Sequence, residues 1–336
     1  MTQPIRMFAA IRPDEFARLY DGATQEALGD LGDLVIGAAE NDRVPVPPNV
    51  ADSFDVLITS WSTQPFDPAI LTGSRLKLAV HSAGSVRGLY PADVLTTGLR
   101  LVQGGAEAMA VAVAEMSVTM TLALLRNLVL HDRRFQSSRD WRTGGVGILG
   151  RSITAQRIGL VSLSRVGRHY ARMVQGLGAT ELRAYDPYIS AADATALGVQ
   201  LCDLDELCET SDVLAINAPA TAQTAGMIGA EQLALLRDDA IVINTARARV
   251  TDEHALLAEL RSGRLRAGLD VFTQEPLDPQ SELFGLENVV LTPHVAGGTV
   301  EARFAQGQIV MEEIRQFLTD GSLQHEVTAE NYHRLG

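Results

Sequence analysis

Short, apolar, β-rich runs alternate with helical stretches along nearly the whole chain, and this alternation constrains the fold more than any other feature. It predicts an α/β class in which helices cover parallel sheets. We predict strands at residues 33–37, 55–59, 77–81, 99–103, 158–161, 182–186, 212–217, 241–245, 266–271 and 289–292. We predict helices at 13–32, 108–125, 166–177, 231–238, 252–262 and 299–319, with Thr251 capping the fifth. Because 336 residues exceed what one core usually spans, we expect two domains.

The segment at residues 108–125 is nearly all apolar and resembles a membrane span in composition. A span needs about 20 apolar residues, and a charge near its centre is costly. Because Glu115 lies near the middle of this segment, we expect a buried helix and no membrane partner.

The overall charge and the cysteines narrow the class of protein further. Acidic residues number 41 and basic residues 28, which gives a net charge of −13 and disfavours nucleic acid as a partner. Cys202 and Cys208 match no metal-binding or redox spacing, so we expect reduced thiols and no metal site. The first 16 residues contain no apolar stretch long enough for a signal peptide. These features predict a cytoplasmic protein.

Residues 158–168, IGLVSLSRVGR, are typical of a strand that runs through a tight turn into a helix. Such a turn holds the pyrophosphate of a dinucleotide when glycines occupy three of its positions, which here are Ser162, Ser164 and Gly167. Alone, the pattern also fits a strand-turn-helix that binds nothing. However, the next strand ends at Asp186, where a carboxylate accepts hydrogen bonds from the adenosine ribose. Since no arginine directly follows Asp186 to bind a 2′-phosphate, we expect NAD rather than NADP.

The two serines are expected to weaken cofactor binding without abolishing it. A Cβ in the left-handed region costs about 1–2 kcal/mol, whereas serine hydroxyls could donate to phosphate oxygens. Because the second position lies nearer the phosphates, we expect Ser164→Gly to tighten NADH binding more than Ser162→Gly. The candidate cofactor contacts in this turn are Ser162, Ser164, Arg165, Val166 and Gly167.

Three further ionisable residues follow predicted strands. Arg247 follows the strand at 241–245, Glu275 the strand at 266–271, and His294 the strand at 289–292. The carboxyl ends of parallel strands are where such sheets bind ligands, so these side chains form a candidate anion-binding and acid–base set. Each residue alone also has a structural interpretation: Arg247 could cap a helix, Glu275 could be a loop carboxylate, and His294 could be a surface residue.

The ordered motifs N-T-A-R at 244–247, D-V-F-x-x-E-P at 270–276 and T-P-H-x-A-G at 292–297 resemble those of the D-isomer-specific 2-hydroxyacid dehydrogenases. The resemblance implies a Rossmann-type, doubly wound nucleotide domain at 106–296. It also implies a flavodoxin-like α/β substrate domain made of 1–105 and 297–336. NAD as cofactor, a 2-keto or 2-hydroxy acid as substrate, and a homodimer packed mostly through the nucleotide domain follow from the same resemblance.

The resemblance also implies a role for each candidate residue. Arg247 would hold the substrate carboxylate and polarise its carbonyl, His294 would exchange a proton with the carbonyl oxygen, and Glu275 would orient His294. Further cofactor contacts would be Pro219 near the adenine, Thr245, Ala246, and Asp270 at the nicotinamide carboxamide. The backbone N–H groups of the HSAG loop would also bind the carboxylate, at Ser82, Ala83 and Gly84.

The chain departs from the family pattern at the two serines, after Arg247, and after the HSAG loop. Arg87 follows that loop, so it either recognises an anionic far end of the substrate or is a surface arginine. Two functions therefore remain. The first is NAD-dependent interconversion of a 2-keto acid and a D-2-hydroxy acid, with His294 as acid and base. The second is a non-catalytic family descendant that binds NAD weakly and acts through interaction or regulation; the serines favour it, and the retained Arg247, Glu275 and His294 favour the first.

Overall fold

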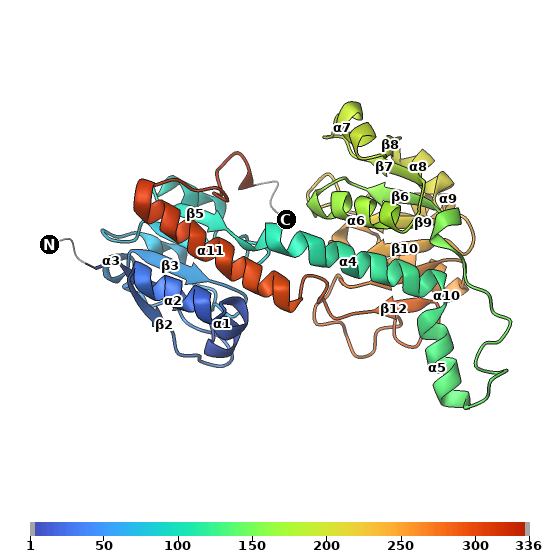
Figure 1. The fold of residues 1–336 in the computed structure, drawn as a ribbon, viewed down its shortest axis with the longest axis horizontal. Coiled ribbons are helices and arrows are strands. Elements are labelled where there is room, and N and C mark those ends of the chain that lie inside the picture. Colours follow the sequence, from blue (N-terminus) through green and yellow to red (C-terminus); the bar gives the residue numbers. More distant parts are fainter. Residues whose placement is uncertain (1–3, 333–336) are drawn as a thin grey trace. The chain divides into compact units, whose positions relative to one another are not determined.

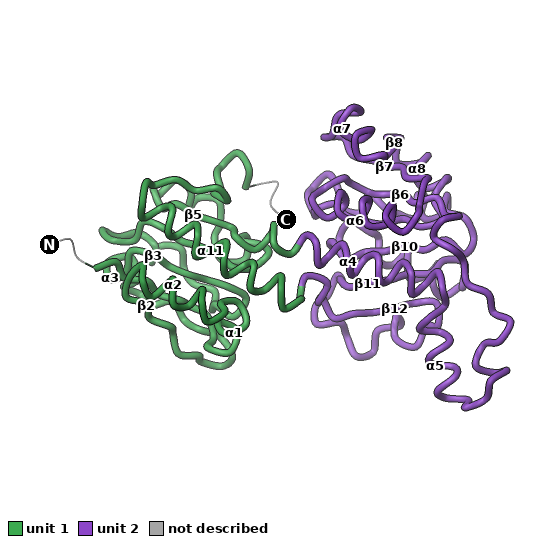
Figure 2. The backbone as a smooth tube through the Cα atoms, viewed as in Figure 1, with its two compact units in different colours: residues 1–109, 298–336 green, residues 110–297 purple. Residues whose placement is uncertain are grey.

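The computed structural model describes residues 4–332, which fall into two compact units (Figure 1; Figure 2). Unit 1 comprises Met1–Met109 and Gly298–Gly336, and unit 2 comprises Ala110–Gly297. Residues 1–3 and 333–336, with which the predicted substrate domain begins and ends, lie outside the described residues. Each unit is built on one parallel sheet with helices on its faces, which confirms the predicted fold class.

Unit 1 contains a five-stranded parallel sheet in the order β2-β1-β3-β4-β5. The strands are β1 (Arg6–Ala10), β2 (Asp33–Ile36), β3 (Val56–Thr59), β4 (Leu78–His81) and β5 (Arg100–Gln103). Alternate side chains of the strands enter two cores, one on each face. One core is closed by α1 (Pro13–Leu19), α2 (Gly22–Leu31) and α11 (Val300–Asp320). The other is closed by α3 (Val50–Ser53), by the short helical turns η1 (Pro68–Leu71) and η2 (Ala92–Thr96), and by the segment that follows α11.

The predicted helix at 13–32 is wrong as a single element, because the chain breaks it at Tyr20. Tyr20 is extended, and the carboxylate of Asp21 accepts a hydrogen bond from Thr24 N, so a new helix starts there. Asp is a strong N-cap because it satisfies an N–H group that has no helical partner. The strand β1 was not predicted, although it is almost completely buried between β2 and β3.

Unit 2 contains a seven-stranded parallel sheet in the order β12-β11-β10-β9-β6-β7-β8. Its strands are β6 (Arg157–Val161), β7 (Glu181–Tyr185), β8 (Gln200–Leu201), β9 (Val213–Ile216), β10 (Ile241–Asn244), β11 (Arg266–Leu269) and β12 (Val289–Leu291). The chain runs outward from β6 in one direction through β7 and in the other through β9. The carboxyl ends of β6 and β9 therefore border a topological switch point, where such sheets bind ligands.

Helices cover both faces of the sheet of unit 2. They are α4 (Gly105–Leu125), α6 (Arg165–Gly176), α7 (Ala191–Ala196), α8 (Leu204–Thr210), α9 (Ala230–Leu235) and α10 (Glu253–Ser262), with short turns η3 (Ile153–Ala155) and η4 (Ala248–Val250). The helix α5 (Leu128–Ser138) has no buried residue and contributes to neither core of this unit. Asp252, rather than the predicted Thr251, caps α10 by accepting from Ala255 N.

The helix α4 is long and apolar enough to cross a membrane by length and composition alone. Half of its most apolar 18-residue window is buried, and Val118, Met120 and Leu124 belong to a core of unit 2. Those side chains pack against the sheet together with Tyr170 and Val174 of α6.

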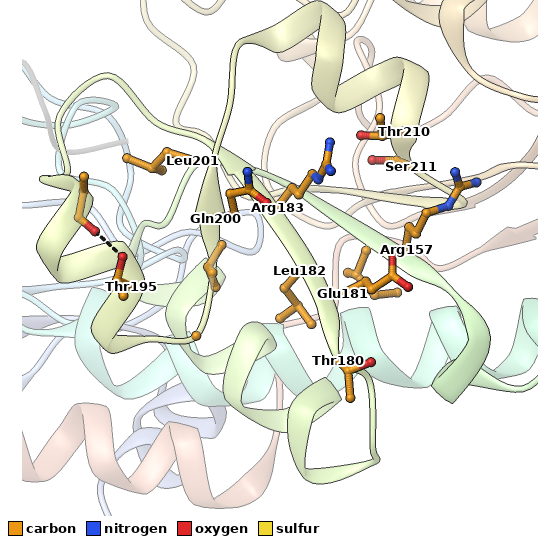
Figure 3. A pocket seen from close by; sticks show the side chains of 14 residues that line it. Arg157, Thr180, Glu181, Leu182, Arg183, Thr195, Gln200, Leu201, Thr210 and Ser211 are labelled. Atoms are coloured by element: carbon orange, nitrogen blue, oxygen red, sulfur yellow. Dashed lines mark hydrogen bonds between the residues drawn. The ribbon is translucent and has the colours of Figure 1, made fainter.

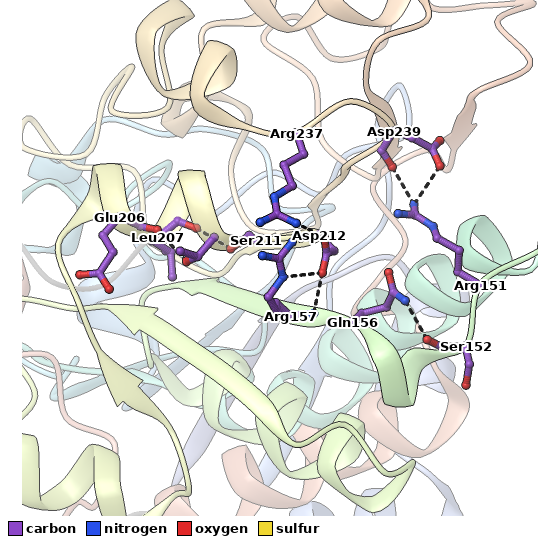
Figure 4. Close-up of polar contacts among 11 residues, drawn as sticks. Arg151, Ser152, Gln156, Arg157, Glu206, Leu207, Ser211, Asp212, Arg237 and Asp239 are labelled. Atoms are coloured by element: carbon purple, nitrogen blue, oxygen red, sulfur yellow. Dashed lines mark hydrogen bonds and ion pairs between the residues drawn. The ribbon is translucent and has the colours of Figure 1, made fainter.

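An arginine–aspartate pair ties the amino ends of β6 and β9 together (Figure 4). Asp212 accepts hydrogen bonds from the backbone N–H and the guanidinium of Arg157, both at 2.9 Å. Burial raises the pKa of Asp212, but the hydrogen bonds from Arg157 outweigh that effect, so its pKa lies below the usual value. The pair therefore stays ionised and anchors the end of the sheet that is opposite the candidate site.

Candidate functional site

The turn after β6 folds as a nucleotide-binding turn does, with its three special positions in distinct conformations. Ser162 has φ +76°, so the left-handed residue is at the first position. Ser164 has φ −55° and caps α6, where its Oγ accepts from Gly167 N. A Cβ on Gly167 would lie 2.3 Å from the carbonyl oxygen of Ser162, so only glycine allows the helix to approach the turn.

Both serine hydroxyls are used inside the turn. Ser162 Oγ donates to Asp186 Oδ2 at 3.1 Å, and Ser164 Oγ donates to the Asn217 carbonyl at 2.9 Å. The expectation that these hydroxyls donate to phosphate is therefore wrong for this conformation. The expected order of the glycine variants stays a prediction, but the structure gives a reason for the reverse order, because the left-handed residue is Ser162, whereas Ser164 has an ordinary conformation and a capping role.

The residues around the turn suit a dinucleotide. The first N–H groups of the 12-residue helix α6 have no helical acceptors and lie at its positive end, which favours a pyrophosphate. Asp186 Oδ2 accepts from Leu163 N at 2.8 Å and Oδ1 from Tyr188 N at 2.9 Å, so the carboxylate is fixed beside the turn with acceptor capacity left for a ribose hydroxyl. Arg165 is exposed and Val166 half-buried in the first turn of α6.

The other predicted cofactor contacts follow the neighbouring strands. Pro219 comes after β9 and is half-buried. Thr245 and Ala246 come after β10; Thr245 is buried and shares a 2.7 Å hydrogen bond with Ser117 of α4, and Ala246 N donates to Asn244 Oδ1. Ser117 was not predicted, and nothing in its local sequence marks it.

Glu275 and His294 meet in the structure. Glu275 Oε2 lies 2.7 Å from His294 Nδ1, while Glu275 Oε1 accepts from Phe272 N at 3.0 Å. The carboxylate is therefore held from one side by the backbone and orients the imidazole from the other. His294 has φ +53°, and its side chain is 49% exposed. Nδ1 is engaged by Glu275, so the second ring nitrogen, Nε2, is the one left for a ligand.

Asp270 is completely buried and holds the loop that carries His294. Its Oδ1 accepts from Thr292 Oγ1 and Val295 N, its Oδ2 accepts from Ala296 N, and its carbonyl accepts from His294 N. A side chain with no exposed surface has no face to offer the nicotinamide carboxamide, so in this conformation Asp270 supports the His294 loop instead. Thr292 has a part in this that was not predicted, although it belongs to the T-P-H motif.

Arg247 follows the strand beside β11, so Arg247, Asp270 and His294 follow three adjacent strands at their carboxyl ends. Its NH1 donates to the Ala246 carbonyl at 2.7 Å, and its own carbonyl accepts from Asn244 Nδ2. The side chain is half-buried.

The predicted carboxylate-binding loop lies in unit 1, after β4. Ser82 N donates to the Thr59 carbonyl at 2.9 Å and extends the strand pairing, so the prediction that this N–H binds a ligand is wrong. Ala83 is buried and Gly84 half-buried. Arg87 NH2 donates to the Tyr332 carbonyl at 3.1 Å, and its guanidinium lies 5.7 Å from the Tyr332 ring centre. These contacts favour a structural role for Arg87 over recognition of a substrate.

His81, just before this loop, is a buried neutral imidazole. Its Nδ1 lies 3.0 Å from Thr59 Oγ1, and burial lowers its pKa to about 4 although a backbone hydrogen bond with Ser85 opposes the shift. Between that value and the unfolded value of about 6.5 the unfolded chain binds more protons, so stability falls as pH drops through this range.

The variant His81→Asn, whose amide can keep the bond to Thr59, tests this effect by urea unfolding. From pH 7 to pH 4.5, we expect the free energy of unfolding to fall by about 2–3 kcal/mol more in wild type than in the variant. Parallel stability profiles of the two proteins would contradict this expectation.

A pocket of about 560 Å³ lies at the other end of the sheet of unit 2, among β6, β7, β8, α7 and α8 (Figure 3). Arg157, Thr180 and Glu181 line it at the amino ends of the strands, away from the residues described above. Its arginines already bind carboxylates: Arg157 binds Asp212, and Arg183 binds Glu206. Among residues 4–332, no group of three or more His, Cys, Asp or Glu residues is placed to hold a metal ion.

The chain is similar in sequence to known dehydrogenases. A family model described as the NAD binding domain of D-isomer specific 2-hydroxyacid dehydrogenases matches residues 118–296. The chain is 38% identical over 205 residues to D-3-phosphoglycerate dehydrogenase of Archaeoglobus fulgidus, covering 61% of this chain and 38% of that protein. It is 32% identical over 300 residues to the enzyme of the same name from Mycobacterium leprae, covering 88% and 56%. The chain thus spans about half the length of the relatives it matches.

Solved structures share the whole fold. D-2-hydroxyisocaproate dehydrogenase matches with a TM-score of 0.83 and 27% identity, over 96% of this chain and 100% of that chain. The holo form of D-mandelate dehydrogenase from Rhodotorula graminis matches with a TM-score of 0.84 over 97% and 98%; at 23% identity this is a likeness of fold.

Proposed function

With residues 118–296 of 336 matched, the chain belongs to the D-isomer-specific 2-hydroxyacid dehydrogenase family, as the sequence motifs suggested, and from this premise we propose that it interconverts a 2-keto acid and a D-2-hydroxy acid. The matched model is an NAD-binding domain, so the cofactor is NAD. The observation that carries the proposal is the 2.7 Å contact between Glu275 and His294 at the carboxyl edge of the sheet of unit 2.

The residues of unit 2 have separate tasks in the proposed reaction. When bound, the nicotinamide supplies or accepts the hydride. The turn from Ser162 to Gly167 and the carboxylate of Asp186 bind the rest of the dinucleotide. His294 gives a proton from Nε2 to the carbonyl oxygen during reduction and takes it back during oxidation, while Glu275 keeps the ring in that orientation. Arg247 binds the substrate carboxylate through charge-assisted hydrogen bonds.

The loop after β4, in unit 1, is proposed to bind a carboxylate. With Ser82 N already bonded to Thr59, the N–H groups of Ala83 and Gly84 remain as the candidate carboxylate donors of this loop. The non-catalytic alternative is not favoured. The turn accommodates both serines with hydrogen bonds, and the acid–base pair, which a binding protein does not need, is intact.

The direct test is turnover of a panel of 2-keto acids with NADH, followed at the nicotinamide absorbance band, with NADPH as the control cofactor. We expect oxidation of NADH by at least one 2-keto acid and quenching of NADH fluorescence on binding. Binding of NADH without turnover of any 2-keto acid would contradict the proposal and support the non-catalytic alternative.

Asp270 gives a second prediction, because Asn in its place turns an acceptor toward Ala296 N into a donor. We expect Asp270→Asn to lower the free energy of unfolding by about 1–3 kcal/mol and to lower kcat, because the His294 loop loses its support. The dissociation constant of NADH is the decisive control. If that constant rises strongly while stability stays at the wild-type value, Asp270 contacts the nicotinamide directly, as the resemblance implied.

We also propose a homodimer formed through unit 2. No side chain of α5 is fully buried, and large apolar side chains of α5 and the segment after it are exposed: Leu128 62%, Phe135 47%, Trp141 71%, Val146 60% and Leu149 87%. Exposed apolar patches of this kind usually mark protein interfaces. We expect wild type to sediment as a dimer and the double variant Trp141→Ser, Leu149→Ser as a monomer. Tyr188→Ser, at an 87% exposed tyrosine elsewhere in unit 2, should remain dimeric.

A cytoplasmic location, a small-molecule substrate, and the absence of membrane and nucleic-acid partners complete the proposal. Cys202 and Cys208 are free thiols, which suits a reducing compartment. Burial raises the pKa of Cys202 to about 11 and that of Cys208 to about 12, so neither is a reactive thiolate at neutral pH.

A further inference from the structure

A stacked arginine and tryptophan stand at the carboxyl edge of the sheet of unit 1. Trp61 follows β3 and is 42% exposed, and the guanidinium carbon of Arg303, in the first turn of α11, lies 4.0 Å from the centre of its ring. Stacking on an aromatic face fixes a guanidinium and leaves its N–H edges free to bind in the plane. The pair is thus a rigid surface with a cation on it.

Gln306 connects Arg303 to the loop after β4. Arg303 NH1 donates to Gln306 Oε1 at 2.9 Å, and Gln306 Nε2 donates to the Ser82 carbonyl at 2.8 Å. Gln306 is completely buried, so this link is protected from water. The side chain of Gln306 therefore links Arg303 directly to the loop that is proposed to bind the carboxylate of a 2-keto acid.

The charge of Arg303 has no counterion in direct contact. Within residues 4–332, Arg303 makes no ion pair and donates hydrogen bonds only through NH1, to Gln306 and to the Met109 sulfur, so its Nε–NH2 edge donates to no residue of that range. Burial lowers the pKa of Arg303; the charge of Glu15 opposes this shift and the charge of Arg18 adds to it, and neither residue makes a direct contact with Arg303. A half-buried guanidinium with an open edge suits a carboxylate, which binds Arg through two parallel hydrogen bonds.

We propose that Trp61 and Arg303 form a subsite for a second carboxylate, so that the substrate is a 2-keto or 2-hydroxy dicarboxylic acid. The Trp61 ring would cover the carbon chain, and the Nε–NH2 edge of Arg303 would bind the far carboxylate. Arg12 follows β1 and donates through its backbone N–H to Ser62 next to Trp61, but its guanidinium pairs with Asp14 and Asp42, so the positive charge at this edge comes from Arg303. This inference rests on the proposed function, and it assigns to Arg303 the anion recognition that was one of two alternatives for Arg87.

The test compares substrates that differ only at the far end. Oxaloacetate and 2-oxoglutarate are each measured with NADH against an isostere in which an isopropyl group replaces the far carboxylate. The variants are Arg303→Met, which can keep the contact with Trp61 without the charge, Arg303→Lys, and the control Arg315→Met. Arg315 lies on the same helix in an exposed pair with Glu312.

For wild type we expect kcat/KM to be higher for at least one diacid than for its isostere. Arg303→Met should lower that ratio about tenfold or more, mostly through KM, because a charge-assisted hydrogen bond is lost. Arg303→Lys should restore part of the ratio, and Arg315→Met should leave it unchanged. Equal losses for diacid and isostere in Arg303→Met would show that the stack is only structural and would overturn the proposal.

A binding measurement separates failure of the subsite from failure of the proposed function. The chain has two tryptophans, so Trp141→Phe leaves Trp61 as the single tryptophan reporter. In the presence of NAD, 2-oxoglutarate or oxaloacetate should change its fluorescence with at least tenfold tighter binding than the isostere, and Arg303→Met should remove that difference. Such selectivity without turnover would keep the subsite and reject the dehydrogenase. Turnover of the isosteres with no diacid selectivity would reject the subsite alone.

Discussion

Replacing His294 with glutamine is expected to lower kcat for reduction of the best 2-keto acid by about 10²–10⁴-fold, the usual contribution of a positioned acid or base. Glutamine is of similar length and polarity, but its amide does not deliver a proton. The substitution should lower kcat and leave NADH binding unchanged, because the dinucleotide turn and Arg247 are elsewhere on the sheet edge. Steady-state kinetics with NADH give kcat, and a fluorescence titration gives the dissociation constant of NADH, so an effect on catalysis is measured separately from an effect on cofactor binding.

Glu275 provides the partner experiment, since it contacts His294 at 2.7 Å and is itself held by Phe272 N. If Glu275 acts only by orienting His294, then Glu275→Gln should lower kcat less than His294→Gln does. The double variant should then be no slower than His294→Gln alone, because groups that act as a unit give non-additive losses. Additive losses would mean that Glu275 has a task of its own, and near wild-type kcat in His294→Gln would remove His294 from the mechanism.

The sequence predicted the parts of the fold that depend on local pattern. Ten strands were expected, and each corresponds to an observed strand within about two residues. The strand β1 was missed because its five residues form a short apolar run near the chain terminus, with no turn signal to bound it. The break between α1 and α2 was missed because Asp21 fits either a helix surface or a cap, and only the observed bond to Thr24 N distinguishes them.

In the candidate site, the sequence motifs predicted which residues matter but not the surroundings of each side chain. Motif order was enough to select Glu275 and His294, because each follows a strand of one sheet. It was not enough to tell whether Asp270 is exposed to a ligand or buried under a loop, since that depends on where Val295 N and Ala296 N point. Likewise, Ser82 and Arg87 lie in the right segment, but their donors are taken by Thr59 and Tyr332, which are distant in the sequence.

Gly167→Ala is expected to have the second large effect, on cofactor binding. The added Cβ would lie 2.3 Å from the Ser162 carbonyl oxygen and 3.4 Å from the Asn217 Cβ, and a backbone carbonyl does not move aside as a flexible side chain does. The first turn of α6 must then shift away from β6, which costs about 1–3 kcal/mol of stability. If the same shift costs about 2 kcal/mol of binding, the dissociation constant of NADH rises about 30-fold.

Gly176→Ala is the matched control, because this glycine ends the same helix and a Cβ there meets nothing within 4 Å. Alanine is the better helix former by up to about 1 kcal/mol, so this variant should be as stable as wild type or more so, with unchanged NADH binding. Comparing the two variants therefore distinguishes the effect of a methyl group at Gly167 from the general effect of adding a methyl group to α6. If Gly167→Ala binds NADH as wild type does, the pyrophosphate does not rest on this turn. The serines at its first and second positions would then belong to a turn that does not bind the pyrophosphate.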